Sequence, residues 1–306
     1  MKLNSKIFIS GYRTIYGKSL EYVLKKNRYT KIFLDQKINQ NYNKLRLFFK
    51  KNKPEYVFCL GGESGGIMKN ILNSTDLLIN NLDYPINVIK LSLEFKVKKL
   101  IFLGSSCCYP VNQSGPIKET KLLKGSIEPT NKPYAIAKIA GMTLCESIYK
   151  QYKKKFITAI PSNPYGPYDD FSESGSHVVA ALIRKFFESK HNNKKVIVWG
   201  NGRAVRDFIY LDDVSEALIL IMKKYNNLEP INISAKPVIN IKTLARTIAR
   251  LIKFNGKIFF DKNKPNGMKY KVLDFNKLRC LGWKNKTNLN NGLLKTYLWY
   301  SKNHKN

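Results

Sequence analysis

Short apolar runs alternate with longer amphipathic stretches through the first half of the chain. Each run is four or five residues long, which suits a strand buried on both faces of a sheet. The runs cover residues 6–10, 31–34, 56–60, 99–103 and 156–160. The stretches between them carry apolar residues at helical spacing. This alternation predicts an α/β fold built on a doubly wound parallel sheet of the Rossmann type.

The helical stretch over residues 73–95 contains Pro85. Proline lacks the amide hydrogen that continues a helix, and its ring clashes with the preceding turn. We therefore expect two helical segments joined at Pro85.

After residue 161 the pattern loosens, although no flexible linker or internal repeat interrupts it. We expect helices over residues 178–187, 241–252 and 288–300 and another ending at Lys224, with strands over 196–199, 231–233 and 257–260. This change predicts two units. Residues 1–163 form the dinucleotide-binding Rossmann domain, with return segments around 203–224. Residues 164–306 form a smaller α/β substrate-binding domain.

The composition describes a folded protein with few cysteines. The chain has 306 residues, of which 43% are hydrophobic, and no apolar run is long enough for a transmembrane helix. The apolar run near the N-terminus is too short for a secretory segment. Five cysteines without Cys-x-x-Cys spacing favour neither a disulfide framework nor a zinc site, so we expect no metal and a cytoplasmic location.

The formal net charge of +33 has two explanations. A nucleic-acid or membrane-surface protein would gather its cations into one patch or motif. Here lysines are scattered along the chain, as a biased coding sequence rich in Lys, Asn and Ile would produce. We therefore expect neither a nucleic-acid nor a membrane partner, although a basic surface would attract an anionic small molecule.

A glycine turn follows the first apolar run, and strand, turn and helix in this order mark the phosphate-binding start of a Rossmann unit. Thr14 stands where a central glycine is usual. Asp35, at the end of the second run, could bond a ribose 2′-hydroxyl and favour NAD, whereas Arg13 could meet the 2′-phosphate of NADP. Both cofactors stay open at this point. The candidate residues of the turn are Gly11, Tyr12, Arg13, Thr14, Ile15, Tyr16 and Gly17.

Tyr134 and Lys138 lie one helical turn apart, downstream of a strand that ends at Ser105 and Ser106. The spacing alone is weak, since Tyr22–Lys26 and Tyr149–Lys153 repeat it. A serine, a tyrosine and a lysine beside a dinucleotide fold can deliver a proton to a carbonyl oxygen. The position after the strand therefore distinguishes the middle pair.

Several segments of the sequence resemble those of the GDP-L-fucose synthase family, which belongs to the extended short-chain dehydrogenase/reductase superfamily. They are LGSSCCYP, EPTNKPYAIAKIAG, LCES, NPYGP, GSHVVAALIRKF, VWGNG, DFIYLDDV and KPNG. The resemblance implies epimerisation of GDP-4-dehydro-6-deoxy-D-mannose at C3 and C5, followed by reduction of C4 with NADPH to give GDP-L-fucose. It also implies a homodimer formed through the Tyr134 helix and the helix before the fourth strand.

The same resemblance implies a set of site residues. Tyr134 would protonate the C4 oxygen, Lys138 would stabilise the phenolate and Ser105 would hold the oxygen. Cys107, two residues beyond Ser105 and so on the same side of an extended chain, would be the base, and His177 its partner acid because histidine titrates near neutral pH. Other implied cofactor contacts are Leu103, Gly104, Ser105, Ser106, Lys138, Pro161, Ser162, Asn163, Pro164 and His177. Implied substrate contacts are Lys185, Trp199, Arg206 and Asn266.

Two alternatives remain open. The same groups could serve a reductase or epimerase of another 4-keto GDP-sugar, such as a GDP-heptose. The altered turn at Thr14 and the acid at Asp35 would weaken NADPH binding or admit NADH, and would also permit a Rossmann-like binding protein without turnover.

Overall fold

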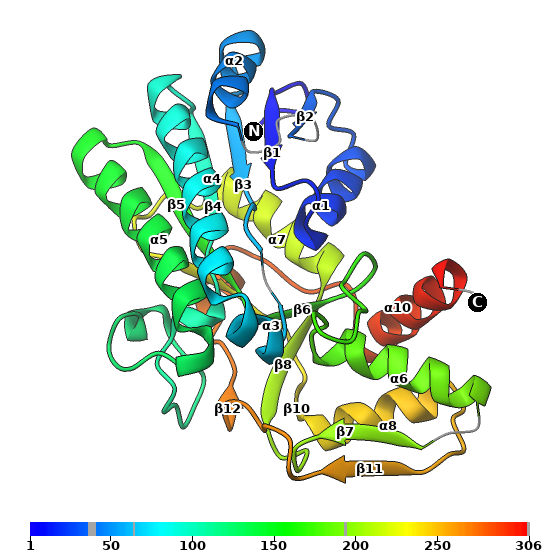
Figure 1. Cartoon of the computed structure of the whole chain (residues 1–306). Coiled ribbons are helices and arrows are strands. Elements are labelled where there is room, and N and C mark those ends of the chain that lie inside the picture. The colour runs from blue at the N-terminus through cyan, green and yellow to red at the C-terminus, as the bar shows by residue number, and fades with distance from the viewer. Residues whose placement is uncertain (36–40, 64, 193–194, 305–306) are drawn as a thin grey trace.

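The computed structural model of the protein describes residues 1–35, 41–63, 65–192 and 195–304. A large lobe surrounds a six-stranded parallel sheet, and a smaller lobe contains two short sheets (Figure 1). The large sheet has the order β2-β1-β3-β4-β5-β9. Its connections change direction between β1 and β3, where ligands bind in doubly wound folds. The expected Rossmann-type sheet is confirmed.

The strands of the large sheet agree with the apolar runs to within a residue or two at their ends. They are β1 (Ile7–Ser10), β2 (Ile32–Leu34), β3 (Tyr56–Cys59), β4 (Lys99–Leu103), β5 (Lys155–Pro161) and β9 (Ile231–Ile233). The last of these comes from the C-terminal half of the chain and pairs with β5.

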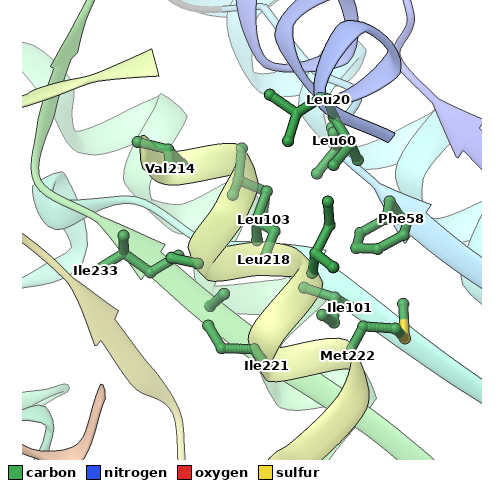
Figure 2. Packing of buried hydrophobic residues seen from close by; sticks show 14 of the residues in the cluster. Leu20, Phe58, Leu60, Ile101, Leu103, Val214, Leu218, Ile221, Met222 and Ile233 are labelled. Atoms are coloured by element: carbon green, nitrogen blue, oxygen red, sulfur yellow. The ribbon is translucent and has the colours of Figure 1, made fainter. Parts of the chain in front are cut away.

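Helices cover both faces of this sheet. One face carries α1 (Ile15–Lys26) and α7 (Leu211–Lys224), and the other carries α2 (Tyr42–Asn52), α4 (Ser74–Glu94) and α5 (Lys132–Tyr152). The short α3 (Ile67–Leu72) precedes α4. Alternate residues of each strand serve opposite faces. In β4, Ile101 and Leu103 pack toward α7 (Figure 2), whereas Leu100 and Phe102 join the core beneath α4 and α5.

The predicted break at Pro85 is wrong. Pro85 lies inside the single helix α4, and Tyr84, Pro85 and Val88 are buried. This helix packs along α5 (Figure 1). Burial of its apolar face therefore outweighs the one backbone hydrogen bond that proline cannot form.

The smaller lobe has its own apolar core. Its strands are β6 (Asn163–Tyr165), β7 (Val196–Trp199), β8 (Val205–Tyr210), β10 (Val238–Asn240), β11 (Ile258–Asp261) and β12 (Tyr270–Lys271). Its helices are α6 (Val178–Asn192), α8 (Ile241–Leu251) and α10 (Leu289–Asn303), and α9 (Asn276–Cys280) lies against β9. The sequence did not indicate β6, β8, β10 and β12. Strands β6, β10 and β12 have only two or three residues, and in β8 the charged residues Arg206 and Asp207 interrupt the apolar pattern. None of the helices in the described ranges has the length and hydrophobicity to cross a bilayer.

Candidate active site

A cavity of about 280 Å³ opens beyond the carboxyl ends of β1, β3, β4 and β5. Its walls come from the first turn of α1, the loops after β3 and β4, helix α5 and the loop that leads to α6. The expected residues that line it are Arg13, Thr14, Ile15, Tyr16, Leu103, Gly104, Ser105, Tyr134, Lys138, Pro161, Ser162 and His177. Arg13 and His177, which are more than 160 positions apart in sequence, therefore line the same cavity.

Gly11 is required where the turn passes the loop after β3. Its φ of +83° belongs to the left-handed region, and a Cβ there would lie 2.4 Å from the amide nitrogen of Gly61. A Cβ on Gly17 would lie 2.4 Å from the carbonyl oxygen of Gly11. Both glycines bring helix α1 close to the turn, so the amides of its first turn face the cavity.

Thr14 has a structural use at the position of the missing glycine. Its backbone is extended, with φ of −73°, and its hydroxyl caps α1 by accepting from the amide of Gly17 at 3.1 Å. The same hydroxyl donates to the carbonyl of Gly11 at 2.7 Å. Threonine fits this backbone without strain and stabilises the helix start.

Asp35 is held against the glycine turn. Its carboxylate accepts from the amide of Gly11 at 2.5 Å, from the amide of Tyr12 at 3.0 Å and from the hydroxyl of Tyr84 at 2.7 Å. Burial and the Asp35 carboxylate both raise the pKa of Tyr84, which keeps that hydroxyl protonated. Asp35 therefore orders the turn and brings a negative charge to it.

Tyr134 and Lys138 both project into the cavity from α5. The Lys138 ammonium lies 5.8 Å from the centre of the Tyr134 ring and donates to the carbonyl of Gly61 at 3.2 Å. Burial lowers the pKa of Lys138 to about 8. Burial raises the pKa of Tyr134, and a hydrogen bond with Ser105 opposes that rise. In this geometry Tyr134 is a protonated hydrogen-bond donor, and Lys138 and Ser105 lie beside it.

The other two Tyr-x-x-x-Lys pairs lie elsewhere. The Tyr22 side chain is exposed on α1, and the Tyr149 hydroxyl donates to the carbonyl of Asn226. Neither tyrosine lines the cavity.

The chain around Cys107 is not extended as expected. Residues Ser106–Cys108 form a turn of 3-10 helix, in which the amide of Cys107 donates to the Ser105 hydroxyl at 3.2 Å. Cys107 is nevertheless partly exposed, whereas Cys108 is buried and its pKa is raised to about 12 by burial. Cys107 is therefore the more accessible of the two cysteines, although it is not among the residues that line the cavity, and its role as base stays a prediction.

Lys271 was not anticipated, yet its ammonium lies 3.7 Å from the Cys107 sulfur. It reaches this position on β12, where it is the register partner of Arg206 on β8. Lys271 and Cys107 are 164 positions apart in sequence, and the pairing of β12 with β8 helps to bring them together. The ammonium can donate a hydrogen bond to this sulfur.

His177 lines the cavity, but it does not titrate near neutral pH as expected. Desolvation, together with the charges of Lys271 and Lys69, lowers its pKa to about 4, and the charge of Asp170 opposes them. The imidazole is therefore neutral at pH 7 in this structure. The sequence could not reveal this, because the desolvation arises from the tertiary fold.

The four expected substrate residues lie outside this cavity, on the smaller lobe. The Lys185 ammonium is 5.5 Å from the centre of the Trp199 ring, and the ring is 40% exposed. The Asn266 side chain accepts from the amide of Asn201 at 2.7 Å, and a Cβ on the next residue, Gly267, would lie 3.4 Å from Arg206. Lys185 thus lies beside Trp199, and the loop that carries Asn266 passes beside Arg206. Lys271 is the register partner of Arg206 and lies beside Cys107.

Other expected cofactor residues do not line the cavity. The Asn163 side chain donates to the carbonyl and carboxylate of Asp207, and so ties β6 to β8. Ser106 is buried. Those outside the lining are Gly11, Tyr12, Gly17, Asp35, Ser106, Asn163 and Pro164.

The residues present fit a dinucleotide. The first turn of α1 lines the cavity, where its amides suit a diphosphate, and the same cavity reaches Tyr134 and Lys138, where a reactive ring would lie. Among the described residues, His, Cys, Asp and Glu side chains form no cluster of three that could hold a metal ion.

Comparison with known proteins gives relatives along nearly the whole chain. A family model described as the NAD dependent epimerase/dehydratase family matches residues 7–234. GDP-L-fucose synthase 1 of Arabidopsis thaliana is 39% identical over 304 residues, 98% of this chain and 94% of that protein. A GDP-6-OMe-4-keto-L-xylo-heptose reductase from C. jejuni has a TM-score of 0.92 at 31% identity and covers 99% of both chains. A GDP-L-fucose synthetase from Naegleria fowleri bound to NADP has a TM-score of 0.89 at 27% identity, over 99% of this chain and 95% of that one.

Proposed function

The chain belongs to the NAD dependent epimerase/dehydratase family, and within it we propose a bifunctional epimerase and reductase. The enzyme converts GDP-4-dehydro-6-deoxy-D-mannose to GDP-L-fucose with NADPH. The supporting observation is one connected set of groups: Ser105, Tyr134, Lys138 and His177 line a single cavity, and Cys107 adjoins it through Ser105.

The reductive step uses Tyr134 and Lys138, which both lie on α5. NADPH supplies a hydride when it is bound. Tyr134 donates the proton to the C4 oxygen, while Ser105 hydrogen-bonds that oxygen and holds it in line. The Lys138 ammonium stabilises the phenolate that this leaves, because a positive charge nearby favours the ionised form.

The epimerising steps use Cys107 and His177. The C4 carbonyl acidifies the hydrogens on C3 and C5, so a thiolate of moderate basicity can remove them. Cys107 is the base, and the Lys271 ammonium lies 3.7 Å from its sulfur. His177 returns a proton to the opposite face. The negative charge of a bound GDP-sugar raises the pKa of His177 from its low value and so makes imidazolium accessible.

The nucleotide is held on the smaller lobe. Trp199 offers an exposed aromatic face for the base, and Lys185, Lys264 and Arg206 supply cations for the diphosphate. Asn266 fixes the loop after β7 through the amide of Asn201. On this arrangement residues 1–163, with return segments around 203–224, form the dinucleotide-binding domain, and residues 164–306 bind the nucleotide sugar.

The protein works as a homodimer in the cytoplasm. Helices α4 and α5 lie side by side and expose Ile79 and Ile136, which suits an interface with a second copy, whereas Ile148 of α5 is buried in the core. Cys107 must remain a thiol to act as the base, and a reducing compartment keeps it so.

Isotope exchange tests this proposal. The protein is incubated with the GDP-4-keto-6-deoxymannose substrate and NADPH in deuterated water, and the product is examined by NMR. We expect deuterium at C3 and C5, GDP-L-fucose stereochemistry and oxidation of one NADPH per product. Failure to oxidise NADPH with any GDP-keto-sugar, together with no deuterium at C3 or C5, would leave only the binding-protein alternative, whereas exchange without oxidation would indicate an epimerase.

A second candidate is a reductase of a 4-keto GDP-heptose, supported by the close structural likeness to a heptose reductase. The same experiment separates the two. Reduction of a GDP-keto-heptose without deuterium at C3 or C5, together with inactivity on the deoxymannose compound, would favour the heptose reductase.

A further inference from the structure

Asp169 is a buried carboxyl group that the proposed chemistry does not use. It follows Tyr168 in the loop between β6 and α6, lines the cavity and is 9% exposed. One oxygen accepts from the amide of Asp170 at 2.9 Å. The other oxygen, Oδ2, is buried and has no hydrogen-bond partner among the described residues. A buried, unpaired carboxylate oxygen is costly, so a ligand or a proton is needed to satisfy it.

The charges around Asp169 come from four elements. The cations lining the same cavity are Arg13 and Lys138, and the acids are Glu63 and Asp170. Tyr16, Tyr134 and His177 face the cavity as neutral groups. Desolvation raises the pKa of Asp169 to about 7, with a smaller contribution from the Asp170 charge, and the hydrogen bond from the Asp170 amide opposes the rise. Near neutral pH the group can therefore exchange a proton with solvent.

We propose that Asp169 takes up a proton when the dinucleotide fills this cavity and then donates its hydroxyl to that ligand. The proposal rests on the proposed function for the identity of the ligand. The dinucleotide carries several phosphate charges, and it displaces water from an already dry carboxyl group. Added negative charge and added desolvation both favour the protonated acid. Binding and protonation are therefore linked, and each promotes the other.

The linkage has a definite sign. Below pH 7 the free protein already holds the proton, so ligand binding takes up none at Asp169. Above pH 7 the proton must come from solvent, so affinity falls as pH rises until the group stays ionised in the complex as well. We expect the Kd for NADPH to rise by about fivefold between pH 6 and pH 8, with uptake of about half a proton per ligand near pH 7.5.

Calorimetric titration with NADPH alone tests this. Titrations at one pH in two buffers of different ionisation enthalpy give the number of protons taken up. Asp169→Asn keeps the shape but cannot titrate, and Glu173→Gln, which changes an exposed acid of the same loop outside the cavity lining, is the matched control. The 2′-phosphate titrates near pH ~6 in every variant, so the difference between variants is the informative quantity.

The expected result is that Asp169→Asn loses the proton uptake and binds NADPH with less than twofold dependence on pH, while Glu173→Gln resembles the unmodified protein. Equal uptake in Asp169→Asn and the unmodified protein would overturn the proposal. Loss of uptake in His177→Gln instead would assign the proton to the imidazole. If NADPH binds without any proton uptake at Asp169, only this inference is refuted. If NADPH does not bind at all, the proposed cofactor is refuted as well.

Discussion

The two halves of the site differ in how they hold their groups. The large-lobe half, around Tyr134 and Lys138, is enclosed, and desolvation shifts the pKa values of both residues. The small-lobe half, around Trp199 and Asn266, is an exposed face on short strands and loops. Enclosure strengthens electrostatic interactions and suits groups that exchange protons. An exposed face can bind a large anionic nucleotide while water still hydrates part of its charged groups. Changes in the two halves should therefore affect different kinetic constants.

The largest effect is expected for Tyr134→Phe in the enclosed half. Removing the proton donor should lower kcat for NADPH oxidation by about a thousandfold, within the range for loss of a general acid. Deuterium exchange at C3 and C5 should continue, because Cys107 and His177 remain. Stopped-flow absorbance measures the first quantity and NMR the second.

Tyr22→Phe is the matched control for this change, since Tyr22 belongs to another Tyr-x-x-x-Lys pair and is exposed. Its activity should stay within twofold of the unmodified protein. If the Tyr134→Phe enzyme still reduced its substrate at a tenth of the normal rate, Tyr134 could not be the proton donor.

The exposed half should respond in substrate affinity. Trp199→Ala should raise KM for the GDP-sugar about tenfold, because stacking of a base on an aromatic ring contributes about 1–3 kcal/mol. Its kcat should change by less than twofold, since Trp199 lies away from the reacting groups. Phe259→Ala is the control: its exposed ring also lies beside a lysine, Lys195, which directly precedes the neighbouring strand β7. Equal effects of the two substitutions would argue against a nucleotide site at Trp199.

Lys271 joins the two halves, and Lys271→Met should affect two groups in different ways. Alkylation of Cys107 by iodoacetamide at pH 7 should slow by about fivefold, because the thiolate loses its cation. The pKa of His177 should rise, because Lys271 lowers it in the unmodified protein. With only three histidines in the chain, NMR can follow this titration.

A Cys280→Ser background confines alkylation to Cys107, because the remaining cysteines are buried. Lys269→Met, an exposed lysine two residues away, should change neither readout. A merely structural role for Lys271 would lower thermal stability while leaving the ratio of alkylation rates at high and neutral pH unchanged.

The same contrast explains what the sequence could predict. The strands of the large sheet are continuous apolar runs, and Tyr134 and Lys138 are local neighbours on one helix, so short-range pattern identifies both. Lys271 and Asp169 depend on tertiary pairing, since a two-residue strand and an irregular loop bring them to the site. The low pKa of His177 and the unbroken α4 at Pro85 both result from burial, which local sequence does not determine.

The smallest expected effect concerns the choice between the two nicotinamide cofactors in the enclosed half. Asp35 brings its carboxylate to the amides of Gly11 and Tyr12, close to where a 2′-phosphate would lie, while the exposed Arg13 can offset that charge. Because repulsion and attraction nearly balance, fluorescence titration should give a Kd for NADPH only about threefold below that for NADH. Asp35→Asn keeps the side-chain size and removes the charge, so NADPH binding should tighten while NADH binding stays within twofold. A preference beyond a hundredfold in either direction in the unmodified protein would show that one of the two charges acts alone. It would also mean that the turn around Thr14 is more selective than its geometry implies.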